Sequence, residues 1–144
     1  MKLNPLGEVQ YRIKLAQRYL KDAEEAFRRS DWRMVVASSQ SCAENAAKAV
    51  IAFFKVPSWS HDPSSELIDI LSSIPSNVEK LGEGLVSIVR ALAPEHGRST
   101  YGEPTRGLTP WDIYSAADAE RALGMAKKAL ENAVMILKGL GVEV

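Results

Sequence analysis

One stretch constrains the fold more than any other, residues 31–54 with the sequence DWRMVVASSQSCAENAAKAVIAFF. Its length predicts a helix of about six turns. Asp31 is a typical N-cap, because its carboxylate can accept hydrogen bonds from amides that the first turn leaves unpaired. Glu44 and Lys48 are spaced i,i+4, which places them together on one face. Small side chains, which let other helices approach closely, lie on several faces and predict a central position for this helix: Ala37, Ser38, Ser39, Ser41, Cys42, Ala43, Ala46, Ala47, Ala49 and Ala52.

The residues before this helix predict a second helix that pairs with it. Residues 8–29 carry apolar side chains spaced alternately four and three residues apart, namely Val9, Ile13, Ala16, Leu20, Ala23 and Phe27. This spacing is typical of one apolar stripe along a helix. Because only Ser30 and Asp31 separate the two long helices, we expect an antiparallel hairpin.

The middle of the chain indicates a loop and two further helices. Residues 55–65 contain two prolines and are expected to form a loop. Residues 66–72 predict a short helix, and a longer helix runs from Ser76 to about residue 92. The longer helix has the weakest pattern, because Gly82 and Gly84 lower its intrinsic helix propensity.

The segment 93–114 differs in kind from its neighbours. It contains three prolines and three glycines, which predict irregular structure. A loop of this length inside a small domain is uncommon and is often functional. A final helix begins near Ser115, since Ser115 and Asp118 form an S-x-x-D capping pattern, and it ends at Gly139 or Gly141.

These patterns predict a single domain over residues 1–144, an all-α up-down helical bundle of four long helices plus one short helix. The chain has 18 basic and 18 acidic side chains, so no overall basic excess indicates nucleic-acid binding. The lone Cys42 excludes an intrachain disulfide, and we expect it to be buried. The sequence lacks a signal peptide and any apolar run of about 20 residues, so we expect a cytoplasmic protein with no membrane association.

The sequence gives little indication of a metal ion or another cofactor, and we expect none. The two histidines, His61 and His96, lie in separate predicted loops, without the i,i+4 or C-x-x-C spacing that metal ligands favour. The S-H-D-P sequence at 60–63 can hydrogen-bond its own turn and fix the entry into the next helix, which favours a structural role for His61. Glycine-rich phosphate loops and acyl-transfer motifs are also missing from the sequence.

Arg90 and His96 are the strongest candidates for chemistry. A guanidinium can bind two phosphate oxygens and stabilise transition-state charge. An imidazole can take the proton from a ribose 2′-hydroxyl or donate one to the leaving group. Together they suit RNA cleavage without a metal. The alternative is that Arg90 pairs with an acidic neighbour and His96 is a solvated loop residue. Pro94 disfavours a helical backbone at Ala93, so the sequence leaves the relative placement of Arg90 and His96 open.

Arg98 and Tyr101 are the residues that would position a substrate of such an enzyme. Tyr101, Trp111 and Tyr114 can stack on bases, as aromatic side chains do in RNA-binding proteins. They can equally tie the segment 93–114 down onto the bundle, and the sequence leaves both interpretations open.

Four stretches of the chain resemble the HEPN family, small prokaryotic and archaeal helical bundles linked to nucleotide binding and RNA cleavage. Residues 39–49, S-Q-S-C-A-E-N-A-A-K-A, look like the Q-x-A-x-E-K-x-x-K-A signature of the family's second helix. S-H-D at 60–62 is similar to the S-H-x-L that follows it. R-S-T-Y-G-E-P at 98–104 resembles the Arg-Tyr-Pro loop, and D-I-Y-S-A-A-D-A-E-R-A-L at 112–123 looks like the start of the last helix.

The resemblance spans roughly residues 8–138 and implies a HEPN-like bundle that forms a homodimer or pairs with a small nucleotidyltransferase in toxin–antitoxin style. Catalytic members carry an Arg-x4–6-His motif whose two copies meet at the dimer interface, and Arg90 and His96 match it with five intervening residues. Ala91 and Pro94 depart from the pattern. We therefore expect a nucleotide- or RNA-associated partner of a nucleotidyltransferase, with metal-independent endoribonuclease activity as its chemistry. The alternative is a non-catalytic scaffold that binds a partner protein or nucleotide through loop 93–114.

Overall fold

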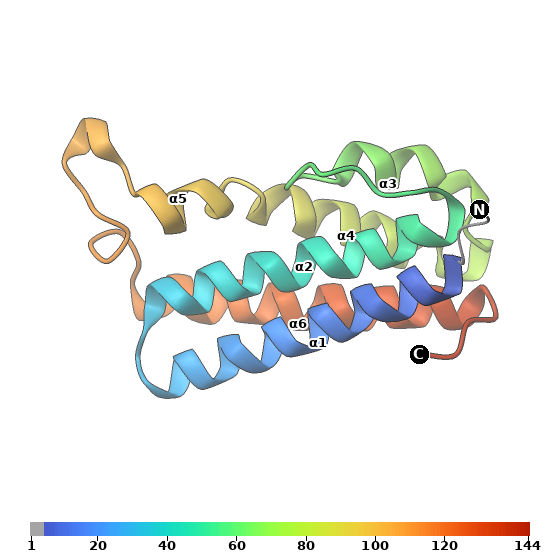
Figure 1. The fold of residues 1–144 in the computed structure, drawn as a ribbon, viewed down its shortest axis with the longest axis horizontal. Helices are drawn as coiled ribbons and strands as arrows, with labels where there is room; N and C mark the ends of the chain where they lie inside the picture. Colours follow the sequence, from blue (N-terminus) through green and yellow to red (C-terminus); the bar gives the residue numbers. More distant parts are fainter. Residues whose placement is uncertain (1–4) are drawn as a thin grey trace.

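The N-terminal half forms an antiparallel hairpin of two long helices, α1 (Pro5–Arg28) and α2 (Trp32–Phe54). The structure is a computed structural model that describes residues 5–144 (Figure 1). Asp31 caps α2 as predicted, since its Oδ1 accepts a hydrogen bond from the amide of Met34 at 3.2 Å. Ser30 adopts a positive φ of 58°, which lets the chain reverse in so few residues.

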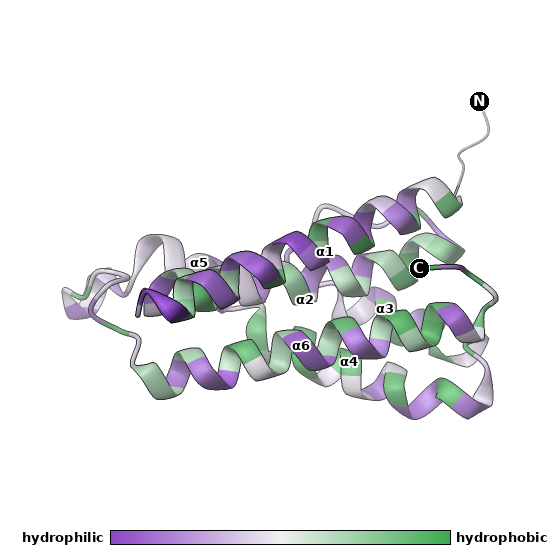
Figure 2. Cartoon of the chain, turned by 90° about the horizontal axis from the view of Figure 1, so that it is seen from below, coloured by the Kyte–Doolittle hydropathy of each residue, from purple (hydrophilic) through white to green (hydrophobic). Residues whose placement is uncertain are grey.

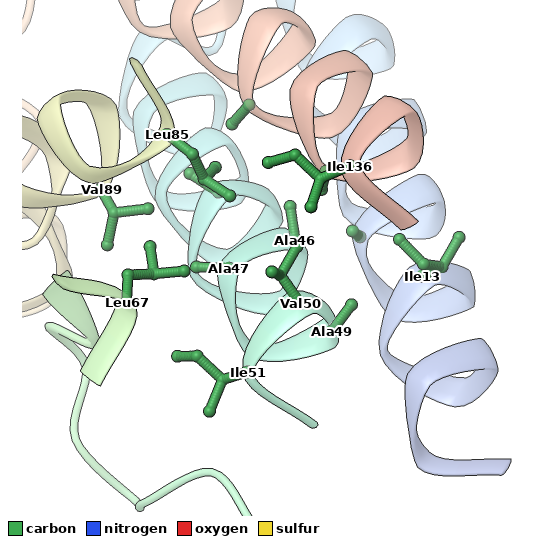
Figure 3. Packing of buried hydrophobic residues seen from close by; sticks show 14 of the residues in the cluster. Ile13, Ala46, Ala47, Ala49, Val50, Ile51, Leu67, Leu85, Val89 and Ile136 are labelled. Atoms are coloured by element: carbon green, nitrogen blue, oxygen red, sulfur yellow. The ribbon is translucent and has the colours of Figure 1, made fainter. Parts of the chain in front are cut away.

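The helix α2 lies at the centre of the bundle, as its small residues predict. It contacts α1, α3, α4, α5 and α6. Figure 3 shows side chains of α2 between Ile13 of α1, Ile136 of α6, Leu85 of α4 and Leu67 of α3. The buried small residues of α2 bring these helices close, while the larger buried side chains fill the space between them.

The second half adds α3 (Ser64–Ile70), α4 (Glu79–Leu92) and α6 (Ala116–Gly139). Ser76 begins a 3-10 turn, η2 (Ser76–Val78), rather than capping α4, and a second 3-10 turn, η1 (Leu71–Ser73), follows α3. Gly82 lets the Leu71 side chain pack directly on α4, because a Cβ at this position would lie 2.7 Å from Cδ2 of Leu71 and would displace it. α6 begins with the predicted capping box between Ser115 and Asp118.

The prediction that segment 93–114 is irregular was wrong in its first part. Glu95–Tyr101 form a further helix, α5, and Pro104–Arg106 a 3-10 turn, η3. Ala93 has helical φ and ψ of −51° and −43° despite the following proline, and Pro94 suits the start of α5, where its missing N–H costs nothing. Gly102 ends α5 at a φ of 73°. The bundle therefore has two short α-helices beside its four long ones.

Residues 102–115, which connect α5 to α6, project beyond the end of the bundle (Figure 1). Glu103 and Leu108 pair there in an isolated antiparallel bridge. Gly102 allows this turn, because a Cβ would lie 2.3 Å from the carbonyl oxygen of Leu108. We call residues 102–115 the arm.

Polar and apolar side chains alternate along α1 and α6, as Figure 2 shows. Within residues 5–144, every helix is too short or too polar to cross a membrane.

Cys42 is buried as predicted, and burial raises the pKa of its thiol to about 12. It is therefore an unreactive packing residue rather than a nucleophile.

Candidate functional site

Arg90 and His96 lie on either side of the junction between α4 and α5. Arg90 is exposed in the last turn of α4, and His96 is half-buried in the first turn of α5. Among the residues the structure describes, Arg90 has no hydrogen-bond or ion-pair partner, so the alternative of an acidic neighbour finds no support. Its guanidinium is available to a ligand.

His96 is held by the buried core of α2 rather than being a solvated loop residue. Its Nδ1 lies 3.3 Å from Oε1 of Gln40, a side chain that is 2% exposed. An amide oxygen only accepts, so the proton of this contact belongs to Nδ1 and Nε2 keeps a lone pair. Gln40 therefore fixes both the orientation and the tautomer of the imidazole.

His61 packs directly on His96, which the sequence analysis did not predict. The segment after α2, drawn as a green coil, runs back beside this helix (Figure 1), and the carbonyl of His61 accepts from Gln40 at 3.5 Å. The two rings stack with centroids 3.5 Å apart and planes at 16°. His61 Nδ1 lies 3.1 Å from Oε1 of Glu44. The S-H-D-P turn forms the expected hydrogen bonds within itself, between Ser60 and Asp62, and the Asp62 carboxylate accepts from the amide of Ser64 at the start of α3.

A buried polar stripe on α2 supports the two imidazoles. Gln40 donates to Oε1 of Glu44 at 3.0 Å, and Lys48 donates to Oε2 at 3.2 Å. Lys48 is 3% exposed, and a charge so deeply buried requires a partner. We call Gln40, Glu44, Lys48, His61 and His96 the histidine cluster.

The histidine cluster has the composition of a metal site, contrary to what the separation of the histidines suggested. Glu44, His61 and His96 each offer one donor atom, and these atoms all lie within 4.8 Å of one another. A carboxylate and two imidazoles are ligands that zinc uses in proteins. The sequence signal that could have found the cluster is the i,i+4,i+8 spacing of Gln40, Glu44 and Lys48, which places three polar side chains on one face of an otherwise buried helix.

A cleft of about 940 Å³ opens beside the cluster, between α1, α2 and the segment 55–61. Its lining includes the polar side chains of Arg12, Glu44, Asn45, Lys48 and His61 and the aromatic side chains of Tyr19, Phe53, Phe54 and Trp59. Arg12 is positioned by Glu8 at 2.9 Å and by Asn45 at 3.0 Å. Trp59 is 96% exposed at the rim. Two cations of this lining are each paired with a carboxylate that also lines the cleft, Arg12 with Glu8 and Lys48 with Glu44, and the aromatic side chains suit a planar ligand.

Arg98 belongs to a second polar cluster, at the base of the arm. It pairs with Glu95 and, at 2.8 Å, with Glu103, and it lies 5.7 Å from the ring centroid of Tyr114. The Tyr114 hydroxyl donates to Glu95 at 2.8 Å. Arg106 pairs with the other oxygen of Glu103 at 2.6 Å. We call Glu95, Arg98, Glu103, Arg106 and Tyr114 the arginine cluster.

The pKa shifts in the arginine cluster reflect this mutual pairing. The hydrogen bond with Glu103 raises the pKa of Arg98, and the hydrogen bonds from Arg98 and then Arg106 lower the pKa of Glu103. Burial, followed by the hydrogen bond to Glu95, raises the pKa of Tyr114. The Arg98 guanidinium is therefore occupied by protein groups.

The sequence left open whether Tyr101, Trp111 and Tyr114 stack on bases or tie the segment 93–114 to the bundle, and the structure separates them. Tyr114 is tied to the bundle through Glu95, and the Trp111 ring lies 5.0 Å from the guanidinium of Arg33, which donates to the Ser99 carbonyl at 2.9 Å. Tyr101 is 75% exposed. Within residues 5–144 its side chain makes no polar or ring contact, so a ligand can reach the Tyr101 ring.

Comparisons with known proteins place this geometry in a family. The profile of the HEPN domain matches residues 9–137. Among solved structures, the fold is similar to that described as the crystal structure of TT1696 from Thermus thermophilus, with a TM-score of 0.69 over 90% of this chain and 98% of that one. The two sequences are 19% identical, so the likeness shows the fold alone. A search of the curated proteins finds no match.

Proposed function

Since the chain belongs to the HEPN domain family, we propose that it works on RNA as a metal-independent endoribonuclease, with a small nucleotidyltransferase as its toxin–antitoxin partner. The family is associated with such partners and with ribonuclease activity. We propose that two copies of the chain form a homodimer, so that the two Arg90–His96 motifs share one RNA-binding surface.

The observation that carries this proposal is the way His96 is held. Gln40 engages Nδ1 of the imidazole at 3.3 Å, which leaves Nε2 as the nitrogen that exchanges protons. In the proposed reaction Nε2 takes the proton from the ribose 2′-hydroxyl as its oxygen attacks the adjacent phosphorus. The bond from phosphorus to the 5′-oxygen of the next nucleotide breaks, and that oxygen takes a proton from water, while the His96 imidazolium returns its proton to the solvent. The products are a 2′,3′-cyclic phosphate and a free 5′-hydroxyl.

Arg90 and Tyr101 supply binding in this proposal. The unpaired guanidinium of Arg90 contacts the phosphate oxygens, on which negative charge grows in the transition state. The exposed ring of Tyr101 stacks on a base near the scissile bond. Arg98 acts as a positioning residue, because its ion pairs with Glu95 and Glu103 hold the residues at the end of α5.

A second candidate function is a non-catalytic scaffold that docks a partner protein or nucleotide through residues 93–114. The observation that favours it is the arm, which projects beyond the bundle (Figure 1) and exposes Trp111. The arginine cluster holds the base of the arm in one arrangement, which reduces the entropy lost on binding.

Incubation of the purified protein with single-stranded RNA in EDTA separates the two functions. The endoribonuclease proposal predicts cleavage by the wild type and loss of cleavage in His96→Ala and Arg90→Ala. Arg18→Ala is the matched control, because Arg18 is an exposed arginine on α1 that pairs with Asp22. Wild-type protein that leaves the RNA intact, alone and with its nucleotidyltransferase partner, would favour the scaffold.

A further inference from the structure

We propose that Glu44, His61 and His96 form a binding site for one Zn²⁺ ion. Their donor atoms lie within 4.8 Å of one another, and donors around a tetrahedral zinc are about 3.3 Å apart, from bonds of about 2.0–2.1 Å. His61 Nδ1 and Glu44 Oε1 already have this separation, at 3.1 Å. Two imidazoles and one carboxylate leave a fourth position for water, as in catalytic zinc sites.

The groups behind these three residues are those that commonly orient zinc ligands. Histidine ligands usually give their second ring N–H to a protein oxygen, and His96 does so through Nδ1 to Gln40. Lys48 engages Oε2 of Glu44 at 3.2 Å, which leaves Oε1 facing the histidines. That oxygen also accepts from Gln40, but a carboxylate oxygen has a second lone pair for the ion.

Binding requires the reorientation of one ring. The lone pairs of an imidazole lie in its plane, and the two stacked planes differ by 16°, so one ring must tilt before both can bind one ion. His61 is the ring that can move, because its side chain is 55% exposed and it lies on an irregular segment. The cleft, which His61 and Glu44 line, gives the ion access.

The buried ammonium of Lys48 sets the expected strength of the site. It lies on the same carboxylate as the ion would, and like charges in a region of low dielectric repel. We therefore expect zinc to bind more weakly here than at a site with the same ligands and no neighbouring cation. This keeps zinc exchangeable and makes the occupancy of the site dependent on its concentration.

Zinc at this site would inhibit the proposed ribonuclease. An ion bound to His96 occupies the lone pair that accepts the 2′-hydroxyl proton. This consequence rests on the proposed function, whereas the binding itself does not. Binding of zinc by a protein that never cleaves RNA would leave the site proposal standing and remove the proposed reaction.

The test is a calorimetric titration of the untagged full chain with Zn²⁺ alone. The wild type is expected to bind one ion per chain, and His61→Ala, His96→Ala and Glu44→Gln are each expected to weaken binding at least tenfold. Asp69→Asn is the matched control, an exposed carboxylate that pairs with Lys55 at 3.9 Å outside the cluster. Co²⁺ in place of Zn²⁺ should give the visible absorption of a four-coordinate ion, and His61→Ala should abolish it.

Two results would overturn the site. One is that the wild type binds less than one zinc ion per chain even at millimolar Zn²⁺. The other is a His61→Ala variant that binds as the wild type does. His61→Ala keeps the test decisive if Glu44→Gln fails to fold, because the His61 side chain is exposed and its loss leaves the core intact.

Discussion

The two polar clusters that include residues of α5 differ in whether their hydrogen bonds leave any donor or acceptor without a partner. In the arginine cluster each charged group faces an opposite charge, with Arg98 between Glu95 and Glu103. In the histidine cluster one nitrogen of each imidazole is held, and in the part of the chain that the structure describes the other has no partner. The arginine cluster therefore has a structural role, because its charges are paired with one another. The histidine cluster can bind a ligand or transfer a proton, because each oriented imidazole keeps a nitrogen without a protein partner within residues 5–144.

The largest difference between the clusters should appear in RNA cleavage. We expect His96→Ala to lower the cleavage rate by about 10²- to 10⁴-fold, the usual contribution of a general base. We expect Arg98→Ala to lower it less than about tenfold, because Arg98 acts through the backbone of α5. Single-turnover rates on one RNA substrate measure both. Equal losses would contradict the division between the clusters.

The next largest effect concerns stability and Lys48. Lys48→Met leaves the carboxylate of Glu44 without its cation in a buried setting, which should lower the free energy of unfolding by about 3 kcal/mol. Urea denaturation followed by circular dichroism measures this change. Lys127→Met is the control, because Lys127 is an exposed lysine on α6. A loss of less than about 1 kcal/mol would show that Glu44 is solvated or protonated.

A smaller effect is expected from breaking the arginine cluster. Arg98 is partly exposed, and exposed ion pairs contribute about 1 kcal/mol or less to folding. Arg98→Ala should therefore leave the unfolding midpoint almost unchanged while the arm becomes more susceptible to proteolysis near residues 102–115. Limited proteolysis with mass spectrometry detects the difference. Cleavage within the bundle at the same rate would mean that the cluster supports the whole fold.

The smallest effect is on the dependence of stability on pH. Hydrogen bonds from Arg98 and Arg106 lower the pKa of Glu103 below its ordinary 4.5, and those from Ser115 lower the pKa of Asp118 below its ordinary 3.8. A carboxyl with a lowered folded-state pKa stabilises the protein above its unfolded-state pKa, and this contribution is lost as pH falls through the folded value. Stability should therefore fall as the pH drops below about 4.5. The double variant Glu103→Gln, Asp118→Asn should reduce the dependence of the unfolding free energy on pH below about 4.5. An unchanged dependence would mean that other carboxyl groups cause it.

The central helix and its hairpin could be predicted from sequence because their signals are local. Asp31 caps the amide of Met34 three residues on, and the small residues of α2 other than Ala37 and Ser41 are buried. The capping box at Ser115 is equally local. The prediction of irregular structure for segment 93–114 was wrong over α5, because Pro94 precedes this helix and Gly102 follows it, and both residue types are tolerated at helix ends.

The histidine cluster could not be predicted, because it depends on the path of residues 55–63. This segment has no periodic pattern of apolar side chains that would show which helix it packs against. His61 reaches His96 only because the segment after α2 runs back beside that helix (Figure 1). The pattern that carried the family resemblance, residues 39–49, contains Gln40, Glu44 and Lys48. These three residues supported the fold assignment, but their contacts with the two imidazoles appear only in the three-dimensional arrangement.

Proton transfer by His96 is tested most sharply by the identity of the RNA ends produced in EDTA. An oligonucleotide of deoxyribonucleotides with a single ribonucleotide confines the reaction to one 2′-hydroxyl, and mass spectrometry identifies the products. We expect wild-type protein to leave a 2′,3′-cyclic phosphate and a 5′-hydroxyl at that position, and His96→Ala to leave the strand intact. Cleavage at the same rate by His96→Ala, or cleavage of the all-deoxy strand, would contradict proton transfer by an imidazole held on Gln40.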